Sequence, residues 1–474
     1  MKNNRKAEIL WCAWFFGIIK PYIYKKAKKV KGELVKMKKR CLALSLALTM
    51  SLGLANTVMA ASAAEIPIVE DNYREAGDFS EGLAAVRELF YWGFIDHTGK
   101  EVIPCQYGGA KEFSEGLAAV YSDEKWGFID QAGNVVVSFQ YDDVQNFSEG
   151  LAVVSSGGKY GFIDQTGREV VPCKYGSAES FSNGRALVYN SAEAYYGYVD
   201  QAGNEIIPCQ YSDARSFSEG FALVRAGNAW TVIDSMGNKM LPEQYQVLTM
   251  GNWEKNPLVN GAVLVWDNQT NAQYLFNVAG LVIPLDRYTI PEGFSDGLIR
   301  VEDADAAGNW AWGFMDSMGN MVIPCQNASV QPFCEGFARA QMFDGKEGFI
   351  DKAGNFVPVE GKSITSDFSE GFAAVCSNAS GRARYGFIDT AGREVVPCNY
   401  ANVKGFSQGV AAVMNFEGKW GLVDQAGNEI VPCQYALIGH RDDTTNVSEG
   451  CVPVMMGDMS MSWGFLSISG GTAN

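Results

Sequence analysis

The sequence is poor in the side chains that most catalytic and metal sites need. Its 474 residues include only 2 His, and its 11 Cys form no Cys-x-x-Cys pair suited to zinc or redox chemistry. A Gly-x-Gly-x-x-Gly nucleotide-binding fingerprint is also absent. These absences argue against an enzyme, so we expect no catalytic residue, no metal and no cofactor.

Basic residues are also scarce once the N-terminus is set aside. Residues 1–60 hold 13 Lys and Arg against 2 acidic residues, so 25 basic and 52 acidic residues remain, a balance of −27. Such a surface repels nucleic acid and anionic membrane while it keeps a large β protein soluble. We therefore expect no nucleic-acid partner and no membrane contact beyond export.

What the sequence does contain is one series of phrases repeated about ten times, with an early period of 34 residues. A Phe-Ser-Glu-Gly phrase, a Trp-Gly-Phe-Ile-Asp phrase and an Ile-Pro-Cys-Gln-Tyr phrase follow one another in fixed order. The first Phe of each copy is Phe79, Phe113, Phe147, Phe181, Phe217, Phe294, Phe333, Phe368 or Phe406. A degenerate unit near 246–293 and a short last unit give ten full units and an incomplete eleventh.

Each unit is predicted to contain three short strands, which in the first copy are 83–86, 92–96 and 101–107. These runs are bounded by turn residues, and no segment of the array combines helix caps with a sustained 3.6-residue period. Pro104 cannot donate to a ladder, so the third strand should lie at a sheet edge. We expect an all-β fold, an array of about ten three-stranded antiparallel repeats stacked as a solenoid. One or two propeller-like rings are the alternative, although propellers usually have about four to eight four-stranded blades.

The copies differ in length mainly before the Trp-Gly phrase. The distance from the opening Phe to the Trp position runs from 13 residues after Phe79 to 18 after Phe294. Length variation is tolerated at exposed loop tips. This segment is therefore the variable loop of each unit, and the place where copies could specialise for a ligand.

The first position of the Trp-Gly phrase, the Trp slot, is aromatic in every unit except the eighth, where it is Glu347. Tryptophans in this slot could form platforms on which sugar rings or peptides stack. The candidate platforms are Trp92, Trp126, Trp312, Trp420 and Trp463. A stacked aromatic core between neighbouring units is the favoured alternative, because repeat proteins bury a face between copies. Glu347 indicates that the slot is only partly buried, since an ionised carboxylate in a dry stack would be costly.

A repeated Asp closes the Trp-Gly phrase and begins a tight turn, where its side chain can satisfy backbone donors. The residues given this structural role are Asp96, Asp130, Asp164, Asp200 and Asp389. Calcium binding is disfavoured because the other ligand positions of a calcium loop are missing. The Glu of the opening phrase is replaced by Asn183 and Gln408, which suits a surface or capping role better than acid–base chemistry.

Six cysteines share one equivalent position in different units, which argues against a disulfide framework. They are Cys105, Cys173, Cys209, Cys325, Cys398 and Cys433. The same position holds Phe139 in the second unit and Glu243 in the fifth, so it does not demand a thiol. A small residue packed beside Ile and Tyr explains it.

The N-terminus resembles an export signal. Residues 37–60 combine a basic start, an apolar stretch and small residues suited to cleavage, as a secretory signal peptide does. Residues 1–36 form a doubtful upstream leader, 61–78 a short linker and 79–474 the repeat array. We expect an exported protein that is extracellular or associated with the cell envelope.

The order of these phrases resembles the WG-containing repeat family of bacteria, from residue 79 to about residue 465. The resemblance implies a β-rich repeat domain, often in exported or envelope proteins, with no catalytic residues to carry over. Units with Tyr, Thr231 or Glu347 in the motif depart from the family pattern.

Three functions are compatible with this sequence. The leading one is a non-catalytic binding or scaffold protein for protein or cell-envelope ligands. The second is a cell-wall carbohydrate-binding module, and the third is a hydrolase with its site in one exceptional repeat. The most exceptional stretch is 246–260, which is either a decayed repeat or a ligand-specific insertion around Trp253. The ligand, whether a protein or a cell-wall glycan, and the oligomeric state do not follow from the residues.

Overall fold

The computed structural model describes residues 73–248, 261–285, 288–290, 294–304, 308–439, 445–456 and 462–468. They belong to a compact unit that spans Ala63–Asn474, and their secondary structure is entirely β. Their strands form 11 antiparallel sheets of three or four strands, numbered here as blades 1 to 11 in chain order. The predicted leader, the signal peptide and Trp253 lie outside the described residues.

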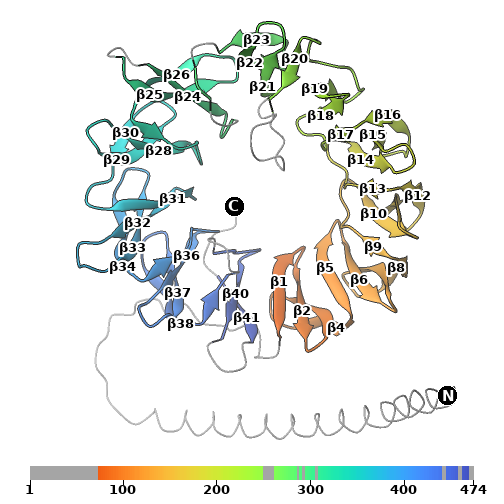
Figure 1. Cartoon of the computed structure of the whole chain (residues 1–474). Helices are drawn as coiled ribbons and strands as arrows, with labels where there is room; N and C mark the ends of the chain where they lie inside the picture. Colours follow the sequence, from red (N-terminus) through yellow and green to blue (C-terminus); the bar gives the residue numbers. More distant parts are fainter. Residues whose placement is uncertain are drawn as a thin grey trace, which may run out of the picture. The chain divides into compact units, whose positions relative to one another are not determined.

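Within each blade the strands follow one another in chain order, from the inside of a ring to its outside (Figure 1). The innermost strands are β1 (Glu75–Ser80), β5 (Gly109–Ser114), β9 (Asp143–Val144), β13 (Ser177–Ala178), β17 (Asp213–Ala214), β20 (Tyr245–Val247), β27 (Ser329–Val330), β31 (Ser363–Ser369), β35 (Asn402–Val403) and β39 (Leu437–Ile438). The second strands are β2 (Leu83–Glu88), β6 (Leu117–Ser122), β10 (Leu151–Ser156), β14 (Arg185–Asn190), β18 (Phe221–Ala226), β21 (Ala262–Asp267), β24 (Leu298–Ala304), β28 (Phe337–Gln341), β32 (Phe372–Ser377), β36 (Val410–Met414) and β40 (Cys451–Met455).

The third strand of each blade carries the Trp slot. These strands are β3 (Tyr91–Asp96), β7 (Lys125–Asp130), β11 (Lys159–Asp164), β15 (Tyr195–Asp200), β19 (Ala229–Asp234), β22 (Ala272–Asn277), β25 (Trp310–Asp316), β29 (Glu347–Asp351), β33 (Arg384–Asp389), β37 (Trp420–Asp424) and β41 (Trp463–Ser467). The outermost strands are β4 (Glu101–Tyr107), β8 (Val135–Tyr141), β12 (Glu169–Tyr175), β16 (Glu205–Tyr211), β23 (Leu281–Pro284), β26 (Met321–Asn327), β30 (Phe356–Pro358), β34 (Glu394–Tyr400) and β38 (Glu429–Tyr435). The Pro-containing strand is thus the outer edge of its sheet, as its missing donor predicts.

Blades 1 and 11 meet, so the predicted solenoid is wrong and the propeller alternative is right, with one ring of 11 blades (Figure 1). The backbone N–H of Trp463 donates to the carbonyl oxygen of Tyr73 at 2.9 Å. The rings of Phe79 and Phe465 pack edge to face with their centroids 5.0 Å apart. Tyr73 pairs with Trp463 in blade 11 as Tyr107 pairs with Trp92 in blade 1. The last unit, which ends early in the sequence, is therefore completed by the start of the array.

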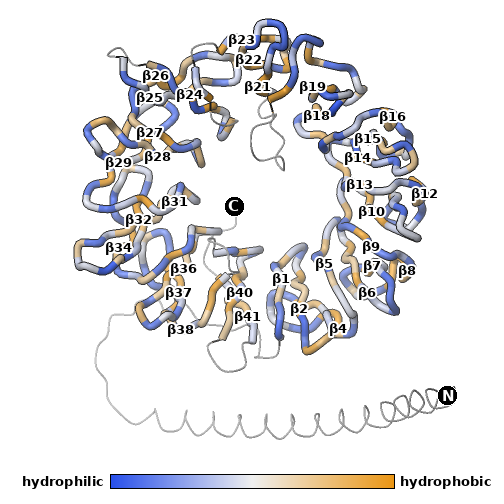
Figure 2. The backbone as a smooth tube through the Cα atoms, viewed as in Figure 1, coloured by the Kyte–Doolittle hydropathy of each residue, from blue (hydrophilic) through white to orange (hydrophobic). Residues whose placement is uncertain are grey.

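The contacts between blades repeat around the ring, and the seam between blades 11 and 1 uses the same ones. The ring of Phe113 in blade 2 packs edge to face on Phe94 in blade 1 at 4.9 Å. The hydroxyl of Ser80 donates to the carbonyl oxygen of Phe113 at 2.8 Å, and Ser448 makes the equivalent bond to Phe79 across the seam. Figure 2 shows hydrophobic residues along the strands and many hydrophilic ones at the outer turns. Every blade buries its apolar positions against its neighbours, so each needs both neighbours to complete its core.

The second position of the Trp-Gly phrase requires Gly, because the backbone of the outer strand passes close to its Cα. A Cβ on Gly93 would lie 2.5 Å from the carbonyl oxygen of Ile103, and one on Gly197 would lie 2.6 Å from that of Ile207. Such contacts leave no room for a side chain. Blade 5 has Thr231 in this position, and there the outer strand is reduced to a single bridge between Ile233 and Lys239.

The predicted three-stranded unit lacks the innermost strand, so most blades have four strands rather than three. This strand is only two residues long in blades 3, 4, 5, 8, 10 and 11, too short for a sequence pattern to reveal. In blade 1 it begins at Glu75, inside the segment predicted as a linker, so the array starts earlier than the sequence indicated.

Candidate functional site

The variable loops gather at one end of the blades, called here the loop face. This face carries the connections between the second and third strands and those from each outer strand to the next blade. The Ser-Glu-Gly hairpins and the Asp turns lie at the opposite end, the turn face. The Trp slots lie within the first three residues of each third strand and therefore near the loop face.

Exposed aromatic side chains concentrate on the loop face. Within the described ranges, the large hydrophobic residues that are most exposed include five aromatics, all in or beside a loop between the second and third strands. They are Phe90 (76% exposed), Tyr91 (47%), Tyr195 (43%), Trp310 (62%) and Phe343 (55%). Sequence reasoning located these loops but missed these residues. The signal was available, since Phe90, Trp310 and Phe343 are large apolar residues within segments predicted to be exposed loops.

The predicted Trp platforms are only partly accessible. Trp92, Trp126, Trp312 and Trp463 are half-buried, whereas Trp420 is 7% exposed and belongs to the core between blades 10 and 11. Trp92 and Trp126 also pack against cores shared with the next blade. The rings thus contribute to the contacts between blades, and ligand binding by them stays a prediction.

A cation lies over the Trp ring in five blades. The charged groups stand 4.9 to 5.9 Å from the ring centroids. The pairs are Arg87 with Trp92, Lys111 with Trp126, Arg215 with Trp230, Arg300 with Trp312 and Lys404 with Trp420. The surroundings of a Trp slot therefore suit positive charge, as the negative face of an indole ring would predict.

The predicted turn residues lie on the turn face, away from the variable loops. Oδ1 of Asp130 accepts the backbone N–H groups of Ala132 at 3.0 Å and Asn134 at 2.8 Å, and Asp96, Asp200 and Asp389 make the same pattern. The hydroxyl of Thr166, with further hydrogen bonds, lowers the pKa of Asp164 to about 2. These carboxylates are held ionised by their turns.

The Glu of the opening phrase links each blade to the next. Oε2 of Glu81 accepts the backbone N–H of Gly116 at 2.8 Å, and Glu449 accepts that of Gly82 at 2.9 Å across the seam. Asn183 makes the equivalent bond to Gly220 at 3.1 Å. Glu, Asn and Gln all offer a side-chain oxygen, which explains why they replace one another here.

Residues 293–297 and 405–409 spell Gly-x-Ser-x-Gly, the pattern of a hydrolase nucleophile elbow. The hydroxyl of Ser295 donates to the carbonyl oxygen of Phe333 at 2.6 Å, and that of Ser407 accepts the N–H of Val447 at 3.2 Å. Both hydroxyls are therefore engaged in contacts between blades.

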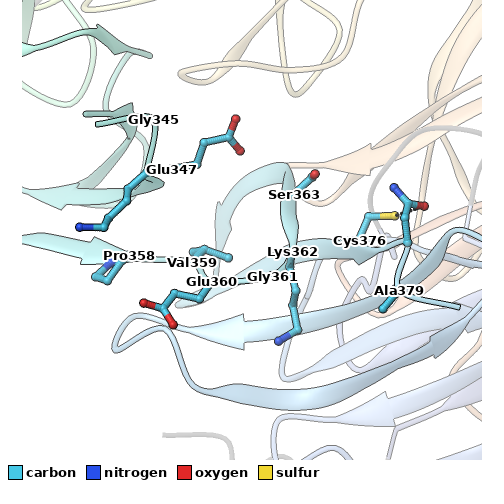
Figure 3. Close-up of a pocket in the computed structure, with 12 residues that line it drawn as sticks. Gly345, Glu347, Pro358, Val359, Glu360, Gly361, Lys362, Ser363, Cys376 and Ala379 are labelled. Atoms are coloured by element: carbon cyan, nitrogen blue, oxygen red, sulfur yellow. Dashed lines mark hydrogen bonds between the residues drawn. The ribbon is translucent and has the colours of Figure 1, made fainter. Parts of the chain in front are cut away.

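A hollow of the loop face lies between blades 8 and 9, with a volume of about 590 Å³ (Figure 3). Three segments line it: the end of the variable loop of blade 8, the 358–363 connection and the variable loop of blade 9. A second hollow of about 350 Å³ shares Glu347 with the first. The sequence placed the exceptional unit at 246–260, of which residues 249–260 lie outside the described ranges, and it gave Glu347 no role as a site.

Other site types find no support among the residues that the structure describes. No group of three or more His, Cys, Asp or Glu is arranged to hold a metal ion there. Nor does that part of the chain contain a helix long and apolar enough to cross a membrane. No disulfide joins any two of the nine cysteines in the described ranges, and burial raises the pKa of Cys105 and Cys451 to about 11.

Several solved structures resemble the chain weakly. A eukaryotic initiation factor gives a TM-score of 0.34 at 10% identity, covering 67% of this chain and 95% of its own. The WD40 β-propeller domain of Doa1 gives 0.23 at 12% identity, covering 54% and 94%. PorZ, a surface component of the type-IX secretion system of Porphyromonas gingivalis, gives 0.23 at 10% identity, covering 85% and 73%. At these TM-scores the likenesses carry no argument about function.

Sequence comparison gives a family assignment. No curated protein matches the chain. The model of the WG containing repeat matches residues 68–88, 92–126, 126–160, 160–190, 196–230, 312–346, 385–420 and 420–459, more than half of the sequence. Its first match begins upstream of β1 and its last extends into blade 11, the two ends that the ring joins. The chain belongs to the WG containing repeat family.

Proposed function

We propose that this protein is an exported, non-catalytic binding or scaffold protein that holds protein or cell-envelope ligands on its loop face. The supporting observation is that length variation and the exposed aromatics Phe90, Trp310 and Phe343 occur in the same loops. Aromatic side chains are enriched at binding interfaces, where burying one contributes about 1.5–3 kcal/mol. Leaving them in water serves no folding purpose, which favours a partner.

A triple variant tests the loop face. Phe90→Ser, Trp310→Ser and Phe343→Ser together remove the most exposed aromatics without touching the contacts between blades. The matched control is Met236→Ser with Met318→Ser, because these residues are 74% and 49% exposed in turns of the opposite face. Co-sedimentation with isolated cell walls, and cross-linking to envelope proteins, should fail for the triple variant and persist for the control. Equal binding by both variants, or an inert wild type, would count against the proposal.

Carbohydrate binding is the second candidate, favoured by the half-buried Trp126 near the loop face. Trp126→Ala should then weaken wall binding that soluble glycan competes away, while a thermal melt shows that the array is still folded. Binding that glycan does not displace would point to a protein ligand instead. Export rests on residues 37–60, and N-terminal sequencing of protein recovered outside the cytoplasm tests it.

A further inference from the structure

The hollow between blades 8 and 9 exists because an aromatic pair is missing there. In seven other blades the slot aromatic stands opposite a residue near the end of the outer strand, as Trp92 does with Tyr107 and Trp420 with Tyr435. In blade 8 Phe349 pairs with Val357 as Phe94 pairs with Ile103 in blade 1. The next position differs, because the N–H of Val359 donates to the carbonyl oxygen of Glu347 at 2.9 Å, so Val359 lies across from Glu347 where Tyr107 lies across from Trp92.

A carboxylate and the smaller Val359 thus stand where two large rings lie in blade 1. The outer strand of blade 8 also ends at Pro358, after only three residues. Val359, which is 8% exposed, and Pro358 form an apolar part of the wall, and Ala379 lines it from blade 9. The space is within the usual size range of ligand pockets, about 300–1,000 Å³.

The cations around this hollow already have partners. Lys346 pairs with Asp344 at 2.7 Å, and Lys362 with Glu394 at 2.7 Å. Glu347 is exposed, and no ion pair within the described ranges involves it. Figure 3 shows its carboxylate on the same side of the pocket as the hydroxyl of Ser363. Glu347 and the hydroxyl of Ser363 can therefore accept hydrogen bonds from a ligand, and Glu360 adds a second carboxylate to the lining.

No Arg or Lys is found over the slot of blade 8 in the described ranges, because the corresponding arginine pairs with another blade. Arg300 of blade 7 lies over Trp312 at 4.9 Å, and the equivalent residue of blade 8 is Arg339, two positions into the second strand in each case. The guanidinium of Arg339 instead pairs with Asp367 of blade 9 at 2.8 Å. Blade 8 thus presents a stronger acceptor of positive charge than the other slots, without a cation of its own.

We propose that this hollow, the Glu347 groove, binds a Lys or Arg side chain on an extended segment of a protein partner. The inference rests on the proposed function, which it deepens by naming the partner's chemistry. The aliphatic stem of the side chain would lie against Pro358 and Val359, and its charged end would donate to Glu347 and Ser363. The acidic surface of the protein attracts such a partner over longer range.

Matched peptides test the groove. Blocked hexapeptides with a central Lys flanked by Val, and the same peptides with norleucine, are titrated against the purified protein in ligand-observed NMR. Because an exposed ion pair contributes modestly, the Lys peptide should bind about fivefold more tightly than the norleucine peptide. This advantage should shrink as salt is raised.

Two variants and one control identify the site. Glu347→Gln should abolish the preference for Lys, and Glu347→Trp should refill the slot with the family residue and remove binding of the peptide. Glu193→Gln makes the same charge change on an exposed residue of the loop face in blade 4, and should keep the preference. Thermal melts check that each variant folds, and Glu347→Trp is expected to be at least as stable as wild type.

The outcomes separate this inference from the proposed function. Equal binding of the Lys and norleucine peptides, or a preference that persists in Glu347→Gln and Glu347→Trp, overturns the groove assignment. Loss of the preference in Glu193→Gln as well would show a response to net charge and would also overturn it. Wall or envelope binding that requires the exposed aromatics would leave the proposed function standing in either case.

Discussion

The seam between blades 11 and 1 offers the sharpest test of the ring. Glu449→Ala removes the acceptor of the Gly82 N–H at 2.9 Å and the partner of His97 Nε2 at 3.2 Å. Elsewhere in the ring the equivalent side chain links two blades that the chain also joins covalently. At the seam the blades are held by non-covalent contacts alone, so the same substitution should have a larger local effect there.

The expected magnitude follows from the two lost contacts. Glu449 and His97 are 36% and 39% exposed, so solvent screens their pairing and it contributes only a few tenths of a kcal/mol. The hydrogen bond to Gly82 contributes about 1 kcal/mol. Opening of the seam should therefore become roughly five to ten times more frequent. The ring should stay closed on average, because the contacts of Phe79 with Phe465 and of Tyr73 with Trp463 remain.

Hydrogen exchange measured by mass spectrometry reads this opening directly. Exchange should rise in β1 and β41 together, although about 390 residues separate them in the sequence, and should be unchanged in β6 and β7. The matched control is Glu115→Ala, which removes the same kind of bond, to Gly150 at 2.9 Å, between two covalently joined blades. Its effect should be confined to blades 2 and 3 and should be smaller.

A rise in β1 without one in β41 would refute the reasoning, because a closed seam must open on both sides at once. An effect of Glu449→Ala no larger than that of Glu115→Ala would refute it as well, since the covalent connection would then make no difference.

Three further predictions concern the repeat itself. Glu115→Asn should be at least as stable as wild type in urea denaturation, because Glu115 has a positive φ of 54° that Asn tolerates better. Asn183 has the same φ and already accepts a hydrogen bond from the glycine N–H of the next blade. Ser138→Pro should stabilise the protein by about 0.4–1 kcal/mol, because Pro occupies this position of the outer strand in the other complete blades. The outer strand crosses Gly127 as closely as in the Pro-bearing blades, since a Cβ on Gly127 would lie 2.6 Å from the Val137 oxygen. Stability should also fall with acid, because the folded pKa of Asp164, about 2, lies below its ordinary 3.8. The stabilisation by this carboxylate is complete above about pH 4 and is lost as the pH falls towards 2. Thermal melts of Asp164→Asn should therefore show a smaller loss of stability over that pH range.

Each of these has a clear contrary outcome. If Glu115→Asn is as destabilised as Glu115→Ala, the left-handed backbone is not what limits this position. Loss of stability in Ser138→Pro would show that its N–H makes a bond that other blades lack. An acid loss of equal size in Asp164→Asn and wild type would assign acid sensitivity to other carboxylates.

The sequence by itself determined the all-β class, the outer position of the Pro-bearing strand and the variable loops, because each depends on local chemistry. A Pro without a donor, a Gly at positive φ and an Asp that accepts turn amides act within a few residues. The exchange of Glu for Asn or Gln likewise indicated a capping role, although not which backbone group is capped.

Only the tertiary structure decided ring or solenoid, the innermost strand and the Glu347 groove. Closure depends on a small rotation between successive blades summed over 11 of them, and neighbouring units make the same contacts in either arrangement. The inner strands are mostly too short to show a pattern and form because a neighbour is present. Glu347 was visible as an exception in the sequence. Its consequence depends on Val359 lying opposite it, and that register exists only once the blade is folded.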